Sequence, residues 1–259
     1  MYPYDLLPGI DLYTIALALA IVSALVIFRI FADKAMLCAK LQNLCIINAS
    51  VSIIFGYLSA VFFQALYNIE KYGEFRLDSQ TGATFYGGLI GGAGIFLLIY
   101  FVAGSKMFKE NREHIKNFFS IADIAAISIV VAHAFGRIGC LMAGCCYGEI
   151  TDKWFGIYMP ALKAKVVPIP LFEAIFLLAL GGVFAYMLLH KKRGILAYYM
   201  MFYGTWRFFI EYARNDYRGT TIVSFLTPSQ LIAILMVIGG AIFLLVQEKL
   251  DQNGKAVQE

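Results

Sequence analysis

Residues 119–148 read FSIADIAAISIVVAHAFGRIGCLMAGCCYG, and the change of character within this stretch decides how the whole chain is interpreted. Its first part, residues 119–140, is apolar over a length that crosses a bilayer as a helix. Its last part, residues 136–148, combines one arginine with three cysteines and four glycines. Arginine at the edge of hydrocarbon is costly and glycine weakens a helix, so this part indicates a functional site at the end of a membrane span.

The remainder of the chain has the composition of a membrane protein. Hydrophobic residues make up 61% of the 259 residues and charged residues only 15%, which excludes an ordinary soluble domain. We expect a lipid bilayer around the chain and no nucleic-acid partner. The sequence predicts an all-α integral membrane protein, a single polytopic domain over residues 1–259 with seven transmembrane helices. The expected spans are residues 12–32, 44–69, 83–104, 119–140, 168–190, 195–213 and 228–247.

The distribution of Lys and Arg predicts the orientation. The loops that follow the first, third, fifth and seventh spans hold twelve of the 21 basic residues, and the opposite side holds nine. Because Lys and Arg collect on the cytoplasmic side, the N-terminus is expected outside and the C-terminus in the cytoplasm. The ends of three spans then meet near the outer face, and they carry the unusual polar residues Tyr86, Arg137, Arg207, Glu211 and Arg214.

Arg137 is the strongest of these candidates. It lies at the end of an apolar helix with His133 one turn earlier, and an ionisable residue at membrane depth favours a functional role. Arg207 and Glu211 are four residues apart, so they form either a structural ion pair on one helix face or part of a site. Arg214 either extends to the interface or belongs to the same site.

Converging arginines suit a phosphate ligand. The guanidinium group is planar and always charged, and it offers two parallel donors to a phosphodiester. Arginines at one membrane interface therefore predict a phospholipid headgroup site. The glycines of residues 87–92, which include Gly87 and Gly88, either pack a helix closely or let the headgroup approach the backbone.

The five cysteines fall into two groups on opposite sides of the membrane. Cys38 and Cys45 are small apolar residues at the start of the second span. Cys140, Cys145 and Cys146 have three open interpretations, namely packing, a disulfide from Cys140 to one of the other two, or thiolate chemistry beside an arginine. Their C-x4-C-C spacing lacks the paired ligands of a zinc site, so we expect no metal and no cofactor.

Five stretches, in this order, resemble the bacterial prolipoprotein diacylglyceryl transferases, and the resemblance spans nearly the whole chain. Two of them carry most of the polar residues discussed above. The five stretches are GGLIGG (87–92), GRIGCLMAGCCYG (136–148), PIPLFEA (168–174), YGTWRFFIEYARND (203–216) and TPSQLIAI (227–234).

The resemblance implies seven transmembrane helices in the bacterial cytoplasmic (inner) membrane, with the active site open to the outer leaflet. It implies transfer of the diacylglyceryl group of phosphatidylglycerol to the thiol of a lipobox cysteine in a prolipoprotein, with glycerol phosphate released. The signature arginine of the family falls on Arg137, and a second motif falls on Arg207 and Glu211. The framing glycines of the signature, together with a family tyrosine, fall on Gly136, Gly139, Gly144, Gly148 and Tyr13.

The chain departs from the family pattern at positions close to the chemistry. Tyr86 stands where the family has a histidine essential for activity, and Cys140, Ala143 and Cys145 stand where the signature has two asparagines and a glutamate. A phenol titrates near 10 and an imidazole near 6.5, so Tyr86 is a poor replacement for a base. The sequence leaves His133 as a candidate base.

Three functions follow from these observations. The first is the family reaction, in which Arg137 and Arg207 hold the phosphate and Glu211 orients Arg207. The second is a thiol-dependent phospholipid transfer to another acceptor, with Cys145 as nucleophile. The third is a phospholipid-binding membrane protein without catalysis.

Overall fold

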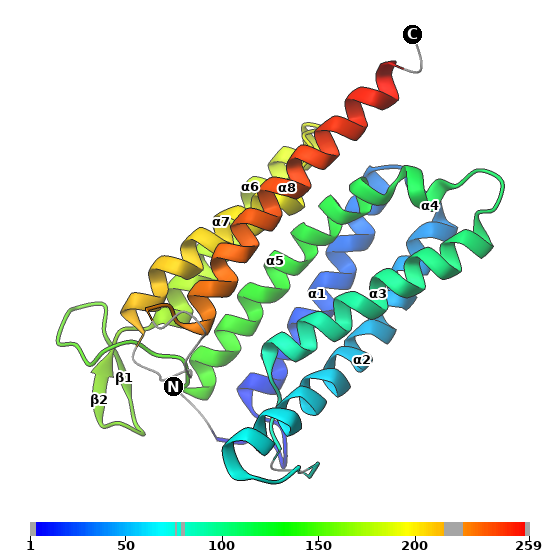
Figure 1. Ribbon diagram of the computed structural model, residues 1–259. Coiled ribbons are helices and arrows are strands. Elements are labelled where there is room, and N and C mark those ends of the chain that lie inside the picture. Colours follow the sequence, from blue (N-terminus) through cyan, green and yellow to red (C-terminus); the bar gives the residue numbers. More distant parts are fainter. Residues whose placement is uncertain (1–3, 76, 79–80, 215–224, 257–259) are drawn as a thin grey trace. The chain divides into compact units, whose positions relative to one another are not determined.

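The computed structural model describes residues 4–75, 77–78, 81–214 and 225–256. Nearly all of the regular structure in this part of the chain is helical (Figure 1). The helices are α1 (Leu12–Lys34), α2 (Ala39–Tyr72), α3 (Phe85–Met107), α4 (Glu113–Lys116), α5 (Phe118–Ala143), α6 (Ile169–Leu189), α7 (Ile195–Ile210) and α8 (Pro228–Ala256).

Six helices within the described residues are long and apolar enough to cross a membrane, namely α1, α2, α3, α5, α6 and α8. The chain is therefore a mostly helical, multi-pass membrane protein. The remaining expected span, residues 195–213 and the sixth along the chain, corresponds to α7 followed by the 3-10 turn η1 (Glu211–Ala213). The 16 residues of α7 extend about 24 Å, which is less than the roughly 30 Å of bilayer hydrocarbon.

The short segment between α5 and α6 contains the only strands among the described residues, and the sequence did not predict them. Strand β1 (Ile157–Met159) pairs antiparallel with β2 (Ala164–Val166), and Tyr158 lies opposite Lys165. Two basic residues of the orientation argument, Arg76 and Arg218, lie outside the described residues.

The chain divides into two compact units, residues 32–118 and residues 1–31 with 119–259. In the first unit, glycines let α2 and α3 approach to backbone contact. A Cβ atom on Gly92 would lie 3.3 Å from the carbonyl oxygen of Ser52, and one on Gly56 would lie 3.1 Å from that of Gly88. Ser59 Oγ donates to the carbonyl of Gly87 at 2.8 Å. The packing interpretation of the 87–92 glycines is therefore confirmed.

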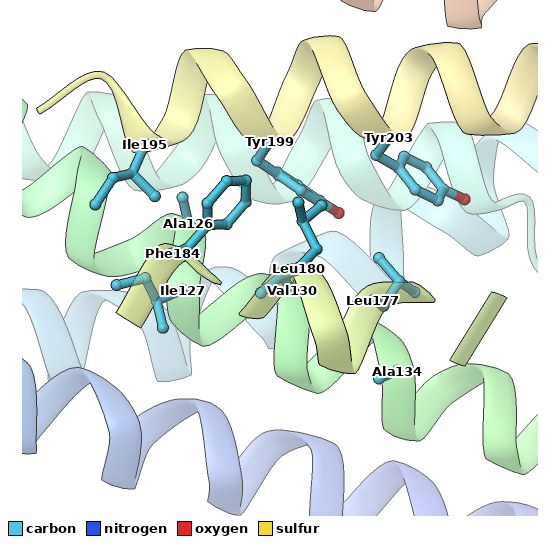
Figure 2. Close-up of a cluster of buried hydrophobic side chains, with 10 residues drawn as sticks. All are labelled: Ala126, Ile127, Val130, Ala134, Leu177, Leu180, Phe184, Ile195, Tyr199 and Tyr203. Carbon is cyan, nitrogen blue, oxygen red and sulfur yellow. The ribbon is translucent and has the colours of Figure 1, made fainter. Parts of the chain in front are cut away.

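The second unit is built around a core from α5, α6 and α7. Figure 2 shows its side chains between these helices, with Tyr199 and Tyr203 one turn apart on α7. Ile27 of α1 and Met236 of α8 pack against this core. The core residues are Ala126, Ile127, Val130, Ala134, Leu177, Leu180, Phe184, Ile195, Tyr199 and Tyr203.

A buried carboxylate fixes the start of α7. Asp123 lies near the beginning of the apolar helix α5 and is 1% exposed. Its two carboxylate oxygens accept the backbone N–H groups of Gly194 and Leu196, each at 3.1 Å. These N–H groups have no partner within α7 because they belong to its first turn. Asp123 therefore caps α7 from a neighbouring helix and sets its position along α5.

The close approach of α2 and α3 predicts different costs for two glycine substitutions on α3. Gly92→Leu places a side chain against the backbone of α2 and should lower the free energy of unfolding by about 1–3 kcal/mol. Gly94→Leu is the matched control, because a Cβ atom there meets nothing within 4 Å. Thermal unfolding of both variants in detergent measures the difference, and equal midpoints would contradict this packing.

Candidate functional site

The polar residues of the second unit gather where α5 ends, α6 begins and α7 ends. At their centre is Glu173, in the first turns of α6, whose side chain is completely buried. A carboxylate in this position would be strongly destabilising without partners, because burial removes its hydration. Its partners come from other elements of the chain.

Arg137 and Tyr203 are the nearest of these partners. Arg137 Nε lies 3.2 Å from Glu173 Oε2, and the Tyr203 hydroxyl donates to Glu173 Oε1 at 3.1 Å. Arg137 Nη2 in turn donates to the Tyr203 hydroxyl oxygen at 3.4 Å. The three side chains therefore form a closed triangle between α5, α6 and α7.

A second ion pair lies at the end of α7. Arg207 Nη2 lies 2.5 Å from Glu211 Oε2, and both side chains are almost completely buried. Two groups near the start of α8 hold this pair, because Arg207 Nη2 donates to Ser229 Oγ at 3.0 Å and Thr227 Oγ1 donates to Glu211 Oε1 at 3.1 Å. The ion pair anticipated from the four-residue spacing is confirmed.

Arg214 joins the two groups. Its Nη1 lies 3.9 Å from Glu173 Oε2 and its Nε lies 3.9 Å from Glu211 Oε2. Its side chain is 2% exposed, so Arg214 is a buried member of the cluster rather than a residue extended to the interface. An isolated β-bridge between Gly148 and Arg214 ties its backbone to the segment that follows α5.

The cluster contains groups of both charges. Three guanidinium groups, those of Arg137, Arg207 and Arg214, face two carboxylates, Glu173 and Glu211. The buried Nη1 of Arg207 also has no hydrogen-bond partner within the described part of the chain. The arrangement therefore offers a buried, charged donor to an anionic ligand.

His133 lies one turn before Arg137 and adjoins the same cluster. Its Nδ1 is 3.0 Å from the Tyr199 hydroxyl, and its ring packs edge-on against Tyr203 with centroids 4.6 Å apart. The imidazole is thus held by two tyrosines of α7.

The chain reverses direction directly after α5 and brings three cysteines together. Gly144 has a φ of 74° and Cys146 a φ of 61°, both in the left-handed region. None of the five cysteines, all of which lie in the described part of the chain, forms a disulfide, and Cys145 is exposed. Hydrogen bonds from Cys140 and Cys145, and then the Arg214 guanidinium, lower the pKa of Cys146 below its ordinary value. Hydrogen bonds to Cys140 and Cys146 raise the pKa of Cys145 instead.

The other predicted residues of this unit have structural positions around the cluster. A Cβ atom on Gly148 would lie 2.6 Å from the carbonyl oxygen of Ala213, so only glycine permits that contact. Gly139 faces Tyr13 of α1, at 3.1 Å from a Cβ atom to Tyr13 Cδ2. A Cβ atom on Gly136 would meet nothing within 4 Å.

Tyr86, Gly87 and Gly88 belong to the other compact unit. Tyr86 is half-buried in the first turn of α3. Gly87 faces Phe63, and Gly88 faces Ala60 and Gly56. Their contribution to substrate binding stays a prediction.

The sequence did not predict that several residues belong to the cluster. Glu173 is the most important, and its signal was a lone carboxylate within the apolar run PIPLFEAIFLL. Tyr199 and Tyr203 gave no such signal, because α7 is rich in aromatic residues that pack in the core. Thr227 precedes α8 and Ser229 lies in its first turn. In the sequence, both are typical of residues that cap a helix.

The fold and this cluster define a class, that of multi-pass helical membrane proteins with a buried, charged site at one end of the helices. Comparison with known families gives a more specific assignment. Residues 6–246 match the family model described as prolipoprotein diacylglyceryl transferase. The chain belongs to this family.

Individual relatives carry the same family name. The chain is 38% identical over 171 residues to "Phosphatidylglycerol--prolipoprotein diacylglyceryl transferase 2" of Clostridium perfringens, a match that covers 63% of this chain and 61% of that protein. It is 30% identical over 206 residues to the transferase of Clostridium tetani, with 76% and 77% covered. It is 28% identical over 231 residues to that of Bacillus cereus strain 03BB102, with 84% and 80% covered.

The buried network predicts a large effect of Glu173→Gln on stability. The substitution keeps the shape of the side chain but leaves Arg137 without its counter-charge, so the free energy of unfolding should fall by about 3–5 kcal/mol. The control is Asp251→Asn, which removes the exposed 3.3 Å pair between Arg193 and Asp251 and should cost about 1 kcal/mol or less. Thermal unfolding in detergent compares the two, and equal losses would contradict the network.

Proposed function

We propose that this protein transfers the diacylglyceryl group of phosphatidylglycerol to the thiol of a lipobox cysteine in a prolipoprotein. The thiol sulfur forms a bond to the glycerol carbon, the bond from that carbon to the phosphate oxygen breaks, and glycerol phosphate leaves. The product is a thioether-linked lipoprotein precursor. The names of the relatives favour this reaction over a transfer to a different acceptor and over a lipid-binding protein without catalysis.

The observation that carries the proposal is the buried Nη1 of Arg207, a guanidinium nitrogen with no hydrogen-bond partner among the described residues. A phosphodiester oxygen is a suitable acceptor for such a charged donor. As the reaction proceeds, negative charge grows on the departing phosphate. Guanidinium groups already fixed by carboxylates stabilise that charge without having to reorganise.

Each residue has a distinct part in this reaction. Arg137 and Arg207 hold the phosphate and stabilise the leaving group, and Arg207 presents its Nη1 to the anion. Glu173 and Glu211 are positioning residues that orient Arg137 and Arg207. His133 is the candidate acceptor of the thiol proton. We further propose that Tyr13, Gly136, Gly139, Gly144 and Gly148 shape this site. Tyr86, Gly87 and Gly88 belong to the other compact unit, and we propose that they bind substrate lipid there.

The proposal includes a placement in the membrane. We infer seven spans in one domain over residues 1–259, with α7 and η1 as the sixth. The N-terminus then lies outside, the C-terminus lies in the cytoplasm, and the arginine cluster faces the outer leaflet of the bacterial inner membrane. This side is the one on which secreted prolipoproteins present their lipobox.

The reaction is tested with purified protein, phosphatidylglycerol and a lipobox peptide. Mass spectrometry of the peptide should show a gain of one diacylglyceryl group, and a peptide with serine in place of the acceptor cysteine should show none. A lipid-sized gain on the protein instead, lost in Cys145→Ser, would replace the proposal by a thiol-dependent transfer. No gain on either molecule would contradict a transferase.

Arg137→Lys tests the role of the guanidinium in the same assay. Lysine keeps the charge but loses the planar pair of donors, so the transfer rate should fall by roughly 10²-fold, the typical effect of removing one donor to a developing anion. Arg193→Lys is the control, because Arg193 is an exposed residue outside the cluster. A rate near that of the unsubstituted protein in Arg137→Lys would remove this arginine from the mechanism.

A further inference from the structure

The three cysteines after α5 form a cluster that the arginine network does not explain. The Sγ atoms of Cys140, Cys145 and Cys146 all lie within 4.8 Å of one another. They come from two parts of the chain, because Cys140 is in the last turns of α5 and the other two follow its end.

The backbone is shaped to make this cluster. The N–H of Cys145 donates to the carbonyl of Cys140 at 3.1 Å, and the chain then turns through the left-handed residues Gly144 and Cys146. A cysteine at positive φ is strained, because its Cβ crowds the backbone, and such strain persists only where the surroundings hold it. The turn therefore folds Cys145 and Cys146 back toward Cys140.

Three mutually close thiols fit a thiophilic metal ion better than they fit a disulfide. A disulfide joins two sulfurs about 2.05 Å apart and would leave the third thiol unused. Around a tetrahedral Zn²⁺ ion, with Zn–S bonds of about 2.3 Å, the sulfurs lie roughly 3.8 Å apart. Each thiol in the structure has to move only slightly to reach that geometry.

The charges around the cluster also suit such an ion. The cluster lies at the C-terminal end of α5, where the partial negative charge of the helix dipole favours a cation. Three thiolates and one Zn²⁺ leave a net charge of about −1, and Arg214, in contact with Cys146, offsets it. Cys145 is exposed, which gives the ion a path from solvent.

We propose that Cys140, Cys145 and Cys146 bind one Zn²⁺ ion, whose fourth coordination position receives the acceptor thiol. The metal site stands on the geometry of the three thiols alone, and its use in the reaction rests on the proposed function. The spacing C-x4-C-C predicted no metal, and the proposal revises that prediction because the turn at Gly144 and Cys146 brings the three thiols together.

The open position gives the ion a chemical role. Three protein ligands with one exchangeable position are the pattern of a catalytic rather than a structural zinc site. The acceptor thiol binds as thiolate and its proton passes to water, since zinc makes a coordinated thiol far more acidic. The sulfur electron pair then attacks the glycerol carbon, and the C–O electron pair leaves with the phosphate.

The ion would supply a way to remove the proton from the acceptor thiol, which the carboxylates of the described arginine cluster do not provide. Both of its carboxylates, Glu173 and Glu211, are engaged with arginines, so neither is available to take the thiol proton. His133, the acceptor of the thiol proton proposed above, is hydrogen-bonded to Tyr199 and lies close to the charges of Arg137 and Arg207, which oppose a further positive charge on its ring. The ion would transfer this role from His133 to water. With the ion in place, deprotonation of the thiol no longer depends on a strong base.

The test begins with metal content measured without substrate. Reduced, purified protein is loaded with Zn²⁺, passed through a desalting column and analysed by inductively coupled plasma mass spectrometry. We expect about one Zn²⁺ per chain, lost in Cys145→Ser and in Cys146→Ser. Cys38→Ser is the matched control, because Cys38 lies in the other compact unit, and it should retain the ion.

Two further measurements separate a lost site from a lost fold. The thermal unfolding midpoints of the serine variants, without added metal, should stay close to that of the metal-free protein. Cobalt loading of the unsubstituted protein should give thiolate-to-metal charge-transfer absorption, which the variants lose. Absence of bound zinc in the unsubstituted protein, or retention of zinc in Cys145→Ser, overturns the metal site.

The role in catalysis is tested by comparing metal-free and zinc-loaded protein in the peptide transfer assay. The metal-free form should bind phosphatidylglycerol but transfer at least about tenfold more slowly, and zinc should restore the rate. Metal-free protein that transfers at the full rate overturns the role of the ion. Because zinc is counted without substrate, a failure of transfer in both forms would count against the proposed reaction and not against the metal site.

Discussion

The buried carboxylate of Glu173 is the interaction on which the rest of the site depends. It has no exposure to solvent, so its charge is tolerable only while Arg137 and Tyr203 contact it, with Arg214 close by. These partners come from α5, α7 and the segment after η1. One side chain of α6 therefore requires three other parts of the chain to be in place, and a network of this kind forms as a unit or not at all.

The same dependence keeps the arginines ready for an anion. A guanidinium on a flexible side chain would have to lose conformational freedom when a phosphate arrives. Here Arg137 and Arg207 are already held by Glu173 and Glu211, and Ser229 fixes Arg207 further. The carboxylates reduce the net charge of the cluster but set the direction in which the remaining donors point.

The sequence predicted features that depend on local spacing and missed those that depend on distant contacts. The apolar lengths gave the helices, the four-residue spacing gave the Arg207–Glu211 pair, and the glycine pattern gave a close-packing face on α3. Glu173 and Asp123 lie within apolar runs of the sequence. Their importance was not predicted, because their partners lie on other helices.

The cysteine cluster shows why spacing alone was insufficient there. The segment C-x4-C-C does not resemble a set of metal ligands until Gly144 and Cys146 adopt left-handed conformations. A non-glycine residue at positive φ is not predictable from its own identity. The β-hairpin of β1 and β2 was missed for a similar reason, since its strands have only three residues each.

The position of α7 has a consequence for how its length can vary. Asp123 of α5 caps its first turn, and Tyr203 and Arg207 near its other end contact Glu173 and Glu211. One inserted or deleted residue between these points would rotate the rest of the helix by about 100° and shift it by about 1.5 Å. Insertions and deletions among relatives that keep this site must therefore fall outside α7.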